Sequence, residues 1–308
     1  MKERFLTSLT SCRKDLRRNY FIYLMLVPVI LYYALFHYGP MYGAQIAFKD
    51  FNILQGIWSS KWIGFDHFIE FFSSFYFTRL LVNTVVLSIY GIIFTFPAPI
   101  LLALMLNEVR QNGYKRFVQT ATYIPHFISL VVICGIIIDF VKQDGLITEF
   151  LTYFGFQNTN LLLESGNFRT IYIVSDIWQQ IGWNSIIYLA ALTSIDQEIY
   201  EAARIDGAGR ISQTVRITLP SILPTIVILL ILRMGTVMNI GFEKVMLLYN
   251  ASIYDKADVI STFVYRRGVL EAAYSYSSAV GLFNSVINCA LVLVTNKLSK
   301  RLTETSLW

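Results

Sequence analysis

Polar side chains interrupt the apolar stretches of this 308-residue chain at a spacing that a helix would align. Asp176, Gln180 and Asn184 are four residues apart, so one helix would place them on one side. Polar groups at membrane depth are costly and usually face a bundle interior or a wet pathway. Amides beside Trp rings suit the hydroxyls and C–H faces of sugars, although polar side chains that only join helices are an alternative. The predicted pathway residues are Asp176, Trp178, Gln179, Gln180, Trp183, Asn184, Arg233, Asn239, Glu243, Asn284 and Asn288.

Two of these residues carry opposite charges inside apolar stretches. Asp176 and Arg233 lie at comparable depths, counted from the same membrane face along their predicted helices. A buried charge is tolerated best beside an opposite charge. We therefore expect an ion pair between Asp176 and Arg233, with separate partners as the alternative.

The elements that must position these residues are transmembrane helices. The chain is 55% hydrophobic and only 15% charged, whereas soluble domains are about a quarter charged. Six apolar stretches are long enough to cross the hydrocarbon core of a bilayer. The fourth is the most polar of the six. The predicted spans are residues 20–38, 80–106, 119–141, 169–193, 219–243 and 278–296.

The distribution of Lys and Arg predicts the orientation of these helices. Most of the basic residues lie in residues 1–19, 107–118, 194–218 and 297–308, which alternate spans place on one side of the membrane. Because basic loops stay in the cytoplasm, both termini are predicted to be cytoplasmic. Residues 39–79 form a predicted external segment rich in aromatic residues, which favour the membrane interface. The predicted core covers residues 80–296.

Several classes of function lack their signatures in this sequence. The three Cys and three His residues are isolated, so no metal site and no catalytic site is predicted. There is no phosphate-binding GxxxxGK[ST] motif and no GxSxG motif. Basic residues are dispersed and not gathered on one face, which argues against nucleic acid as a partner. We expect no enzymatic activity and no bound cofactor.

The loop at residues 194–218 has the pattern of a docking element. Ile195, Ile199 and Ala203 can form the apolar side of a short helix, to which Ile205 adds a fourth apolar residue. Gly207 and Gly209 would then permit a turn that side chains resist. Leu219-Pro220 would open the fifth span, because proline is tolerated in a first helical turn. A lipid-facing amphipathic helix is the competing interpretation.

This loop resembles the EAA signature of ABC importer permeases. Glu201-Ala202-Ala203, Gly207 and Ile217-x-Leu219-Pro220 match that pattern at every position. The run IDQEIYEAARIDGAGR and the segments WIGFDHF (62–68), MNIGFEKVMLLYN (238–250) and YSYSSAVGLFNSVIN (274–288) look like the carbohydrate branch of these permeases. The resemblance covers nearly the whole chain. It implies an all-α type I importer fold with a five-helix core and an additional N-terminal helix.

The resemblance also implies roles and partners. It assigns contact with an ATPase to Glu201, Ala202, Ala203, Asp206 and Gly207. The partners would be a second, non-identical permease, a dimer of ATP-binding cassette subunits that uses ATP and Mg, and an extracellular solute-binding protein. The protein would lie in the bacterial cell membrane as a multi-pass protein, surrounded by lipid.

Rival functions remain open at this stage. A secondary transporter driven by an ion gradient could use Asp176 but would not explain the EAA loop. An importer permease for a solute other than a sugar would share the EAA core. A membrane-embedded enzyme would need clustered His, Asp or Cys residues, and an exporter does not have this separate EAA pattern.

Overall fold

The computed structural model describes residue 15, residues 18–303 and residues 306–307. The chain divides into two compact units, Met1–His67 and Phe68–Trp308. Most of the predicted basic tail at residues 1–19, and part of the predicted tail at 297–308, lies outside the described residues.

The first unit begins with one long helical run, Tyr20–Phe48. It is mostly apolar, and it continues beyond the predicted end of the first span at residue 38. Residues 20–48 contain no Asp, Glu, Lys or Arg, and the helical hydrogen bonding stops before Lys49, the first charged residue after this run. The run consists of α2 (Tyr20–Tyr33), the π-helical turn η1 (Ala34–Tyr38), α3 (Gly39–Met41) and the 3₁₀ turn η2 (Tyr42–Phe48).

A small hairpin follows this run. Strands β1 (Lys49–Asp50) and β2 (Lys61–Trp62) pair antiparallel with Lys49 opposite Trp62, and α4 (Gly56–Ser59) lies between them. The rings of Phe48 and Trp62 stack with centroids 5.6 Å apart. Lys49 is buried and donates to the carbonyl oxygen of Ile57 at 2.6 Å. Ring stacking and this hydrogen bond therefore order a short segment that has few apolar contacts.

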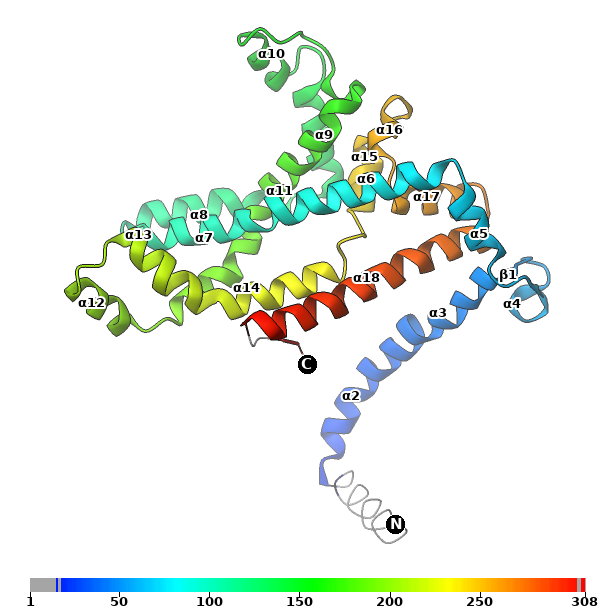
Figure 1. The fold of residues 1–308 in the computed structure, drawn as a ribbon, viewed down its shortest axis with the longest axis horizontal. Helices are drawn as coiled ribbons and strands as arrows, with labels where there is room; N and C mark the ends of the chain where they lie inside the picture. Colours follow the sequence, from blue (N-terminus) through cyan, green and yellow to red (C-terminus); the bar gives the residue numbers. More distant parts are fainter. Residues whose placement is uncertain (1–14, 16–17, 304–305, 308) are drawn as a thin grey trace. The chain divides into compact units, whose positions relative to one another are not determined.

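The second unit is a helical bundle (Figure 1). In chain order its elements are α5 (Asp66–Ser73, from the unit boundary), α6 (Tyr76–Tyr90), η3 (Gly91–Thr95), α7 (Pro97–Glu108), α8 (Asn112–Phe127), α9 (Leu130–Val141), α10 (Leu146–Thr152), η4 (Leu161–Leu163), α11 (Ser165–Thr193), α12 (Gln197–Ile205), α13 (Arg210–Gln213), η5 (Thr214–Thr218), α14 (Leu219–Met234), α15 (Phe242–Leu248), η6 (Ala251–Ile253), α16 (Tyr254–Ala257), α17 (Ile260–Tyr265), η7 (Arg266–Leu270) and α18 (Tyr274–Thr303).

Not all six predicted spans pass a test of length and apolarity. Among the described residues, four helical runs are long and apolar enough to cross a membrane, and a fifth is added if one bent pair counts as a single span. Helix α11 is 29 residues long and matches the predicted fourth span, but it is too polar to qualify. The polar residues that weaken it are those predicted to line a pathway.

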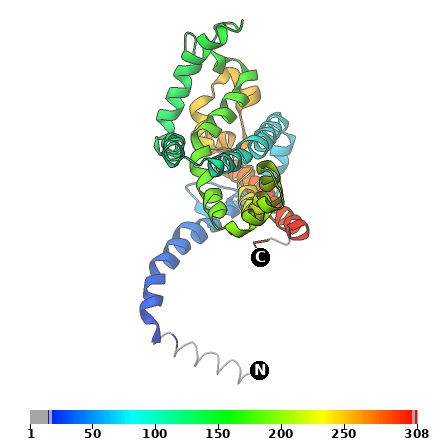
Figure 2. The same ribbon diagram turned by 90° about the vertical axis from the view of Figure 1, so that its left-hand side faces the viewer.

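The predicted third span at 119–141 is not one straight helix. Helices α8 and α9 meet at a bend of 103°. Pro125 lies in the last turn of α8, and Ser129 starts α9 by accepting a hydrogen bond from the backbone N–H of Val132 at 3.4 Å. A proline near a helix end and a serine at the next N-cap both favour a break here. Helix α10 therefore extends away from α7 and α8 in two perpendicular views (Figures 1 and 2).

The predicted fifth span at 219–243 starts with α14 at Leu219 but extends too far, because α14 ends at Met234. The helical run starts at Arg210 and ends at Met234. Pro220 lies in the first turn of α14, as predicted, and the helical run enters α14 from the π-helical turn η5. Residues 235–241 are not helical. Ser88 donates to the carbonyl oxygen of Val237 at 2.7 Å, and Asn288 accepts from the N–H of Met238 at 3.0 Å. Irregular backbone at membrane depth needs such partners.

Helix α11 is the centre of this unit and packs against α7 and α8. The contact with α8 depends on Gly182, because a Cβ atom there would lie 2.2 Å from the carbonyl oxygen of Thr122. A third helix, α14, joins the same core through Ile222, which packs in one cluster with Tyr188 and Leu192 of α11. Helix α11 can therefore present one side to a space bounded by α7 and α14.

Helices α16 and α17 lie at the end of the second unit opposite to α12 (Figure 1), and Asp258, between them in the chain, joins several helices. Its carboxylate is 0% exposed and pairs with Arg79 at 3.2 Å and Arg266 at 2.7 Å. Asn83 donates to the carbonyl oxygen of Asp258 at 2.9 Å. Burial lowers the pKa of Arg266, but the hydrogen bond and charge of Asp258 outweigh it and the pKa is raised. This charged cluster ties α6 to the segment before α18.

Candidate functional site

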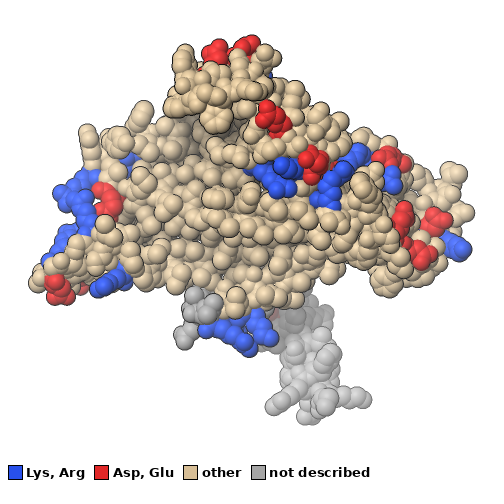
Figure 3. All heavy atoms as spheres, turned by 45° about the horizontal axis from the view of Figure 1, so that its top comes forward, with Lys and Arg blue, Asp and Glu red and all other residues tan. Residues whose placement is uncertain are grey.

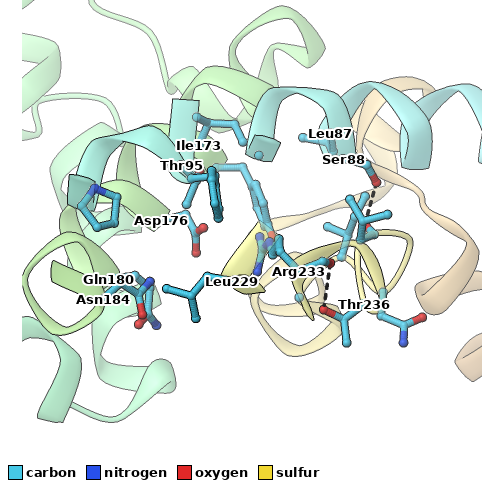
Figure 4. Close-up of a pocket in the computed structure, with 18 of the residues that line it drawn as sticks. Leu87, Ser88, Thr95, Ile173, Asp176, Gln180, Asn184, Leu229, Arg233 and Thr236 are labelled. Carbon is cyan, nitrogen blue, oxygen red and sulfur yellow. Dashed lines mark hydrogen bonds between the residues drawn. The ribbon is translucent and has the colours of Figure 1, made fainter. Parts of the chain in front are cut away.

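A cavity of about 460 Å³ lies beside α11 in the second unit (Figure 4). Helix α11 forms one wall, α6, η3 and α7 form another, and α14 with residues 235–241 completes it. The polar residues that line it are Ser88, Thr95, Tyr172, Asp176, Gln180, Asn184, Tyr188, Arg233, Thr236 and Asn239. Five of the predicted pathway residues, Asp176, Gln180, Asn184, Arg233 and Asn239, are therefore brought together.

Asp176 does not form the expected ion pair with Arg233. Its carboxylate lies 3.5 Å from the ammonium nitrogen of Lys244, which is almost fully buried in α15. Lys244 also lies against the ring of Tyr172, 5.4 Å from its centroid. Because the helix ends at Met234, the chain turns back after Arg233 and can bring Lys244 to Asp176. The prediction assumed a continuous helix, in which Lys244 would lie beyond the membrane.

Arg233 is left without an ion pair within 4 Å among the described residues. It lies in the last turn of α14, and its side chain is exposed to the cavity. Gly91 faces it from the opposite wall, where a Cβ atom would lie 3.7 Å from Nη2 of Arg233, an ordinary contact distance. Figure 4 shows Arg233 and Asp176 on facing elements around the cavity.

The amide residues of α11 divide between two roles. Asn184 is open to the cavity, whereas Oε1 of Gln180 lies 2.9 Å from Nδ1 of His126. The His126 ring stacks on Trp183 with centroids 4.5 Å apart. Gln179 is buried outside the cavity lining. Trp183 therefore contacts α8 and does not form the predicted sugar platform in this cavity.

Asn239 is held in place by the last helix. Its Oδ1 accepts from Nδ2 of Asn284 at 2.7 Å and from Nδ2 of Asn288 at 3.3 Å. Asn284 and Asn288 are buried and do not line the cavity, so they support Asn239 from behind. Glu243 lies in the first turn of α15 and is also outside the lining, because the predicted stripe required a helix that ends at Met234.

Sequence reasoning missed several residues of this cavity. Ser88, Thr95 and Tyr172 line it, and Lys244 supports it from a buried position. The sequence gives little indication of these residues. Isolated hydroxyl groups are common in membrane helices, and Lys244 follows the predicted fifth span, where a loop was expected. A local clue existed in Gly235 and Gly241, which bracket the segment where helical periodicity fails.

A second, mostly apolar groove of about 780 Å³ lies between the α9–α10 arm and the first half of α11. Trp178, a predicted pathway residue, lines this groove together with Phe140, Phe156 and Val174. Trp178 therefore points away from the cavity. The groove has the character of a surface for lipid or for another membrane helix.

The loop at 194–218 forms the predicted short helix, α12. Asp196 caps it by accepting from the N–H of Glu198 at 3.0 Å. Tyr200 reaches the hydroxyl of Thr218 at 2.9 Å, while Ile195 is buried in the bundle. Ile205 is 87% exposed, so it is not part of the side that packs inward. Of the residues assigned to ATPase contact, Glu201, Ala202, Asp206 and Gly207 are exposed, and Ala203 is half-buried.

The turn after α12 depends on one glycine and not on two. Gly207 has φ +79°, and the backbone N–H groups of Gly207 and Ala208 donate to the carbonyl oxygens of Arg204 and Ala203. This is the Schellman arrangement, which favours glycine at that position. Gly209 has φ −69°, an ordinary value for any residue. The prediction was therefore correct for Gly207 and wrong for Gly209.

Among the residues that the structure describes, no three His, Cys, Asp or Glu side chains are grouped to hold a metal ion. The cavity instead offers hydroxyl, amide and guanidinium groups. These groups bind polar organic solutes by hydrogen bonds, and they form no nucleophile–base pair.

Residues 95–302 match the family model described as "Binding-protein-dependent transport system inner membrane component". The chain belongs to this family. It is a multi-pass membrane permease and not an enzyme, and a separate subunit hydrolyses ATP. Similar proteins with known names confirm the resemblance to the carbohydrate branch of ABC importer permeases.

The chain is 44% identical over 294 residues to Protein LplB of Bacillus subtilis (strain 168), covering 95% of this chain and 92% of the relative. It is 45% identical over 289 residues to the polygalacturonan/rhamnogalacturonan transport system permease protein YteP of the same organism, covering 94% and 90%.

A solved structure shares this fold. It is the crystal structure of a bacterial ABC transporter involved in the import of the acidic polysaccharide alginate, with a TM-score of 0.89 and 44% identity over 95% of this chain and 99% of that chain. A second crystal structure, of a bacterial alginate ABC transporter in complex with an alginate pentasaccharide-bound periplasmic protein, matches with a TM-score of 0.89 and 43% identity over 96% and 99%.

Proposed function

We propose that this permease forms half of a translocation pathway for an oligosaccharide, and that the cavity beside α11 is part of that pathway. The cavity combines amide and hydroxyl groups with a cation, which suits a sugar derivative. Relatives similar over most of the chain are named for polygalacturonan or alginate transport. An extracellular binding protein would deliver the oligosaccharide, in keeping with the family description.

A second permease chain completes this proposal. The cavity has walls from α6, α7, α11 and α14 of one chain only. The apolar groove beside the α9–α10 arm would receive helices of a non-identical partner, because an apolar membrane surface packs against apolar helices. We also propose that the chain crosses the membrane six times, that both termini are cytoplasmic, and that the protein lies in a bacterial cell membrane.

The observation that carries the coupling proposal is the geometry of α12. This helix is capped at both ends, exposes Glu201, and is tied by Tyr200 to the helical run that ends at Met234. An ATPase dimer that binds α12 would therefore act on a rigid element next to the cavity. Glu201, Ala202, Ala203, Asp206 and Gly207 are the proposed contact residues.

The Glu201→Lys variant tests this coupling. It reverses the charge of an exposed side chain, so the permease should still fold and insert. We expect the ATPase to co-purify poorly and ATP-driven uptake to fall to background. Glu198→Gln, an exposed change on the same helix, is the matched control and should retain uptake. Normal uptake by Glu201→Lys would reject the assignment.

Uptake by vesicles that contain the reconstituted importer distinguishes this function from that of an ion-gradient transporter. Uptake should require ATP and persist when proton and sodium gradients are collapsed. Asp176 is already neutralised by Lys244, which argues against Asp176 as a coupling acid for protons. Uptake driven by a gradient without ATP would favour the rival.

A further inference from the structure

The charges around the cavity do not balance. Asp176 and Arg233 are the charged residues in its lining. Asp176 is matched by Lys244 at 3.5 Å, whereas the guanidinium of Arg233 has no ion pair within 4 Å among the described residues. An ion pair adds no net charge, so the described walls leave the cavity with one uncompensated positive charge.

An unpaired Arg at membrane depth is costly, about 2.5–3.5 kcal/mol on insertion scales. The fold nevertheless keeps Arg233 open to the cavity and places Gly91 across from it, where a larger side chain would crowd the guanidinium. An anion bound in the cavity would offset the cost. A guanidinium presents two parallel N–H groups that match the two oxygens of a carboxylate.

Resting on the proposed function, we propose that the transported oligosaccharide is acidic and that Arg233 recognises a carboxylate of one of its uronic acid units. Asn184 and Thr236, which line the same cavity, supply neutral hydrogen-bonding groups for the sugar hydroxyls. A cavity of about 460 Å³ falls in the range of small-molecule sites and would hold one segment of the oligosaccharide at a time.

Other arginines of this unit lie outside the cavity lining. Arg79, Arg266 and Arg267 lie near the end opposite α12, with Arg169 at the start of α11 one turn before Tyr172. The acids paired with these residues are Asp258, shared by Arg79 and Arg266, and Glu271, paired with Arg267. On the face drawn in Figure 3, basic side chains lie at several places with acidic side chains beside them. Arg233 is therefore the arginine that a solute in the cavity can reach.

The test compares a charged probe with its neutral ester. The purified complex of both permeases and the ATPase is mixed, without binding protein, with labelled trigalacturonate or with its fully methyl-esterified form. Equilibrium binding then reports the permease cavity alone. We expect wild type to bind the acid about tenfold or more tightly than the ester. Arg233→Gln should reduce this preference to less than about twofold, and Arg233→Lys should retain part of it.

A second pair of variants acts from the opposite wall and keeps the guanidinium. Gly91→Ala places its Cβ 3.7 Å from Nη2 of Arg233, an ordinary contact, and should keep the preference for the acid. Gly91→Leu should cover the guanidinium and remove the preference. Lys297→Gln, an exposed charge change on α18, is the control for net charge and should behave as wild type.

The outcomes separate this inference from the proposed function. If wild type binds the acid and the ester equally, or if Arg233→Gln keeps the preference, the assignment of Arg233 is rejected. Tighter binding of sulfated galactotriose than of trigalacturonate would reject the carboxylate. If the reconstituted wild-type importer takes up no oligosaccharide with ATP, acidic or neutral, the proposed function itself fails.

Discussion

The coupling loop and the cavity are built in opposite ways. Helix α12 is defined by neighbours in sequence, with Asp196 capping its start and Gly207 closing its end. The cavity is defined by residues far apart in the chain, since Ser88 and Asn288 hold the non-helical segment beside Arg233. A local structure can be inferred from short motifs, whereas a structure held by distant partners needs the fold. Substitutions in the two regions should differ accordingly.

The largest effect is expected at Asp258, which supports the non-local region. Asp258→Ala would leave the guanidinium groups of Arg79 and Arg266 without their buried partner. Breaking a buried ion pair in this way costs about 3–5 kcal/mol. We expect a large loss of thermal stability in detergent. Asp255→Ala, an exposed acid three residues earlier, is the control, and equal stability of the two variants would contradict this role.

An intermediate effect is expected at Asn288. Asn288→Leu removes the acceptor for the N–H of Met238 and a donor to Asn239. An unsatisfied buried group costs about 1–3 kcal/mol. Because these bonds shape residues 235–241, ligand binding in the cavity should weaken together with stability. Ser285→Ala, whose hydroxyl bonds only within its own helix, should alter neither measurement.

The smallest effect is expected in the local region. Gly207→Ala forces a side chain into a left-handed conformation, at a cost of about 1–2 kcal/mol. The change should weaken ATPase binding while leaving ligand binding in the cavity intact. Gly209→Ala, at φ −69° with open space around it, should bind the ATPase as wild type does. Equal loss in both variants would contradict the assigned turn.

The sequence predicted much of the fold, and its failures share one cause. Hydrophobic length located the helices, and the spacing of Asp176, Gln180 and Asn184 placed them correctly on one wall. The assumption of unbroken helices failed at Ser129 and at Gly235. Hydrogen bonds from other helices stabilise a helix break of this kind. The hydrophobic periodicity of the broken segment gives no information about those distant partners.

The ion-pair partner of Asp176 was missed for the same reason. Lys244 reaches it only because the chain turns back after Met234. Trp178 and Trp183 fall on other faces of α11, because a helix turns by about 100° per residue. Trp178 lies two residues after Asp176 and Trp183 one residue before Asn184, so neither shares their side.

The helical run Arg210–Met234 has a mechanical consequence. It begins directly after the coupling loop and ends one residue after Arg233, with every residue between them in helical conformation. A helix resists compression along its axis far better than a loop does. Movement imposed at Arg210 can therefore reach the wall of the cavity along one unbroken helical run, which ends at Met234 where the non-helical segment 235–241 begins.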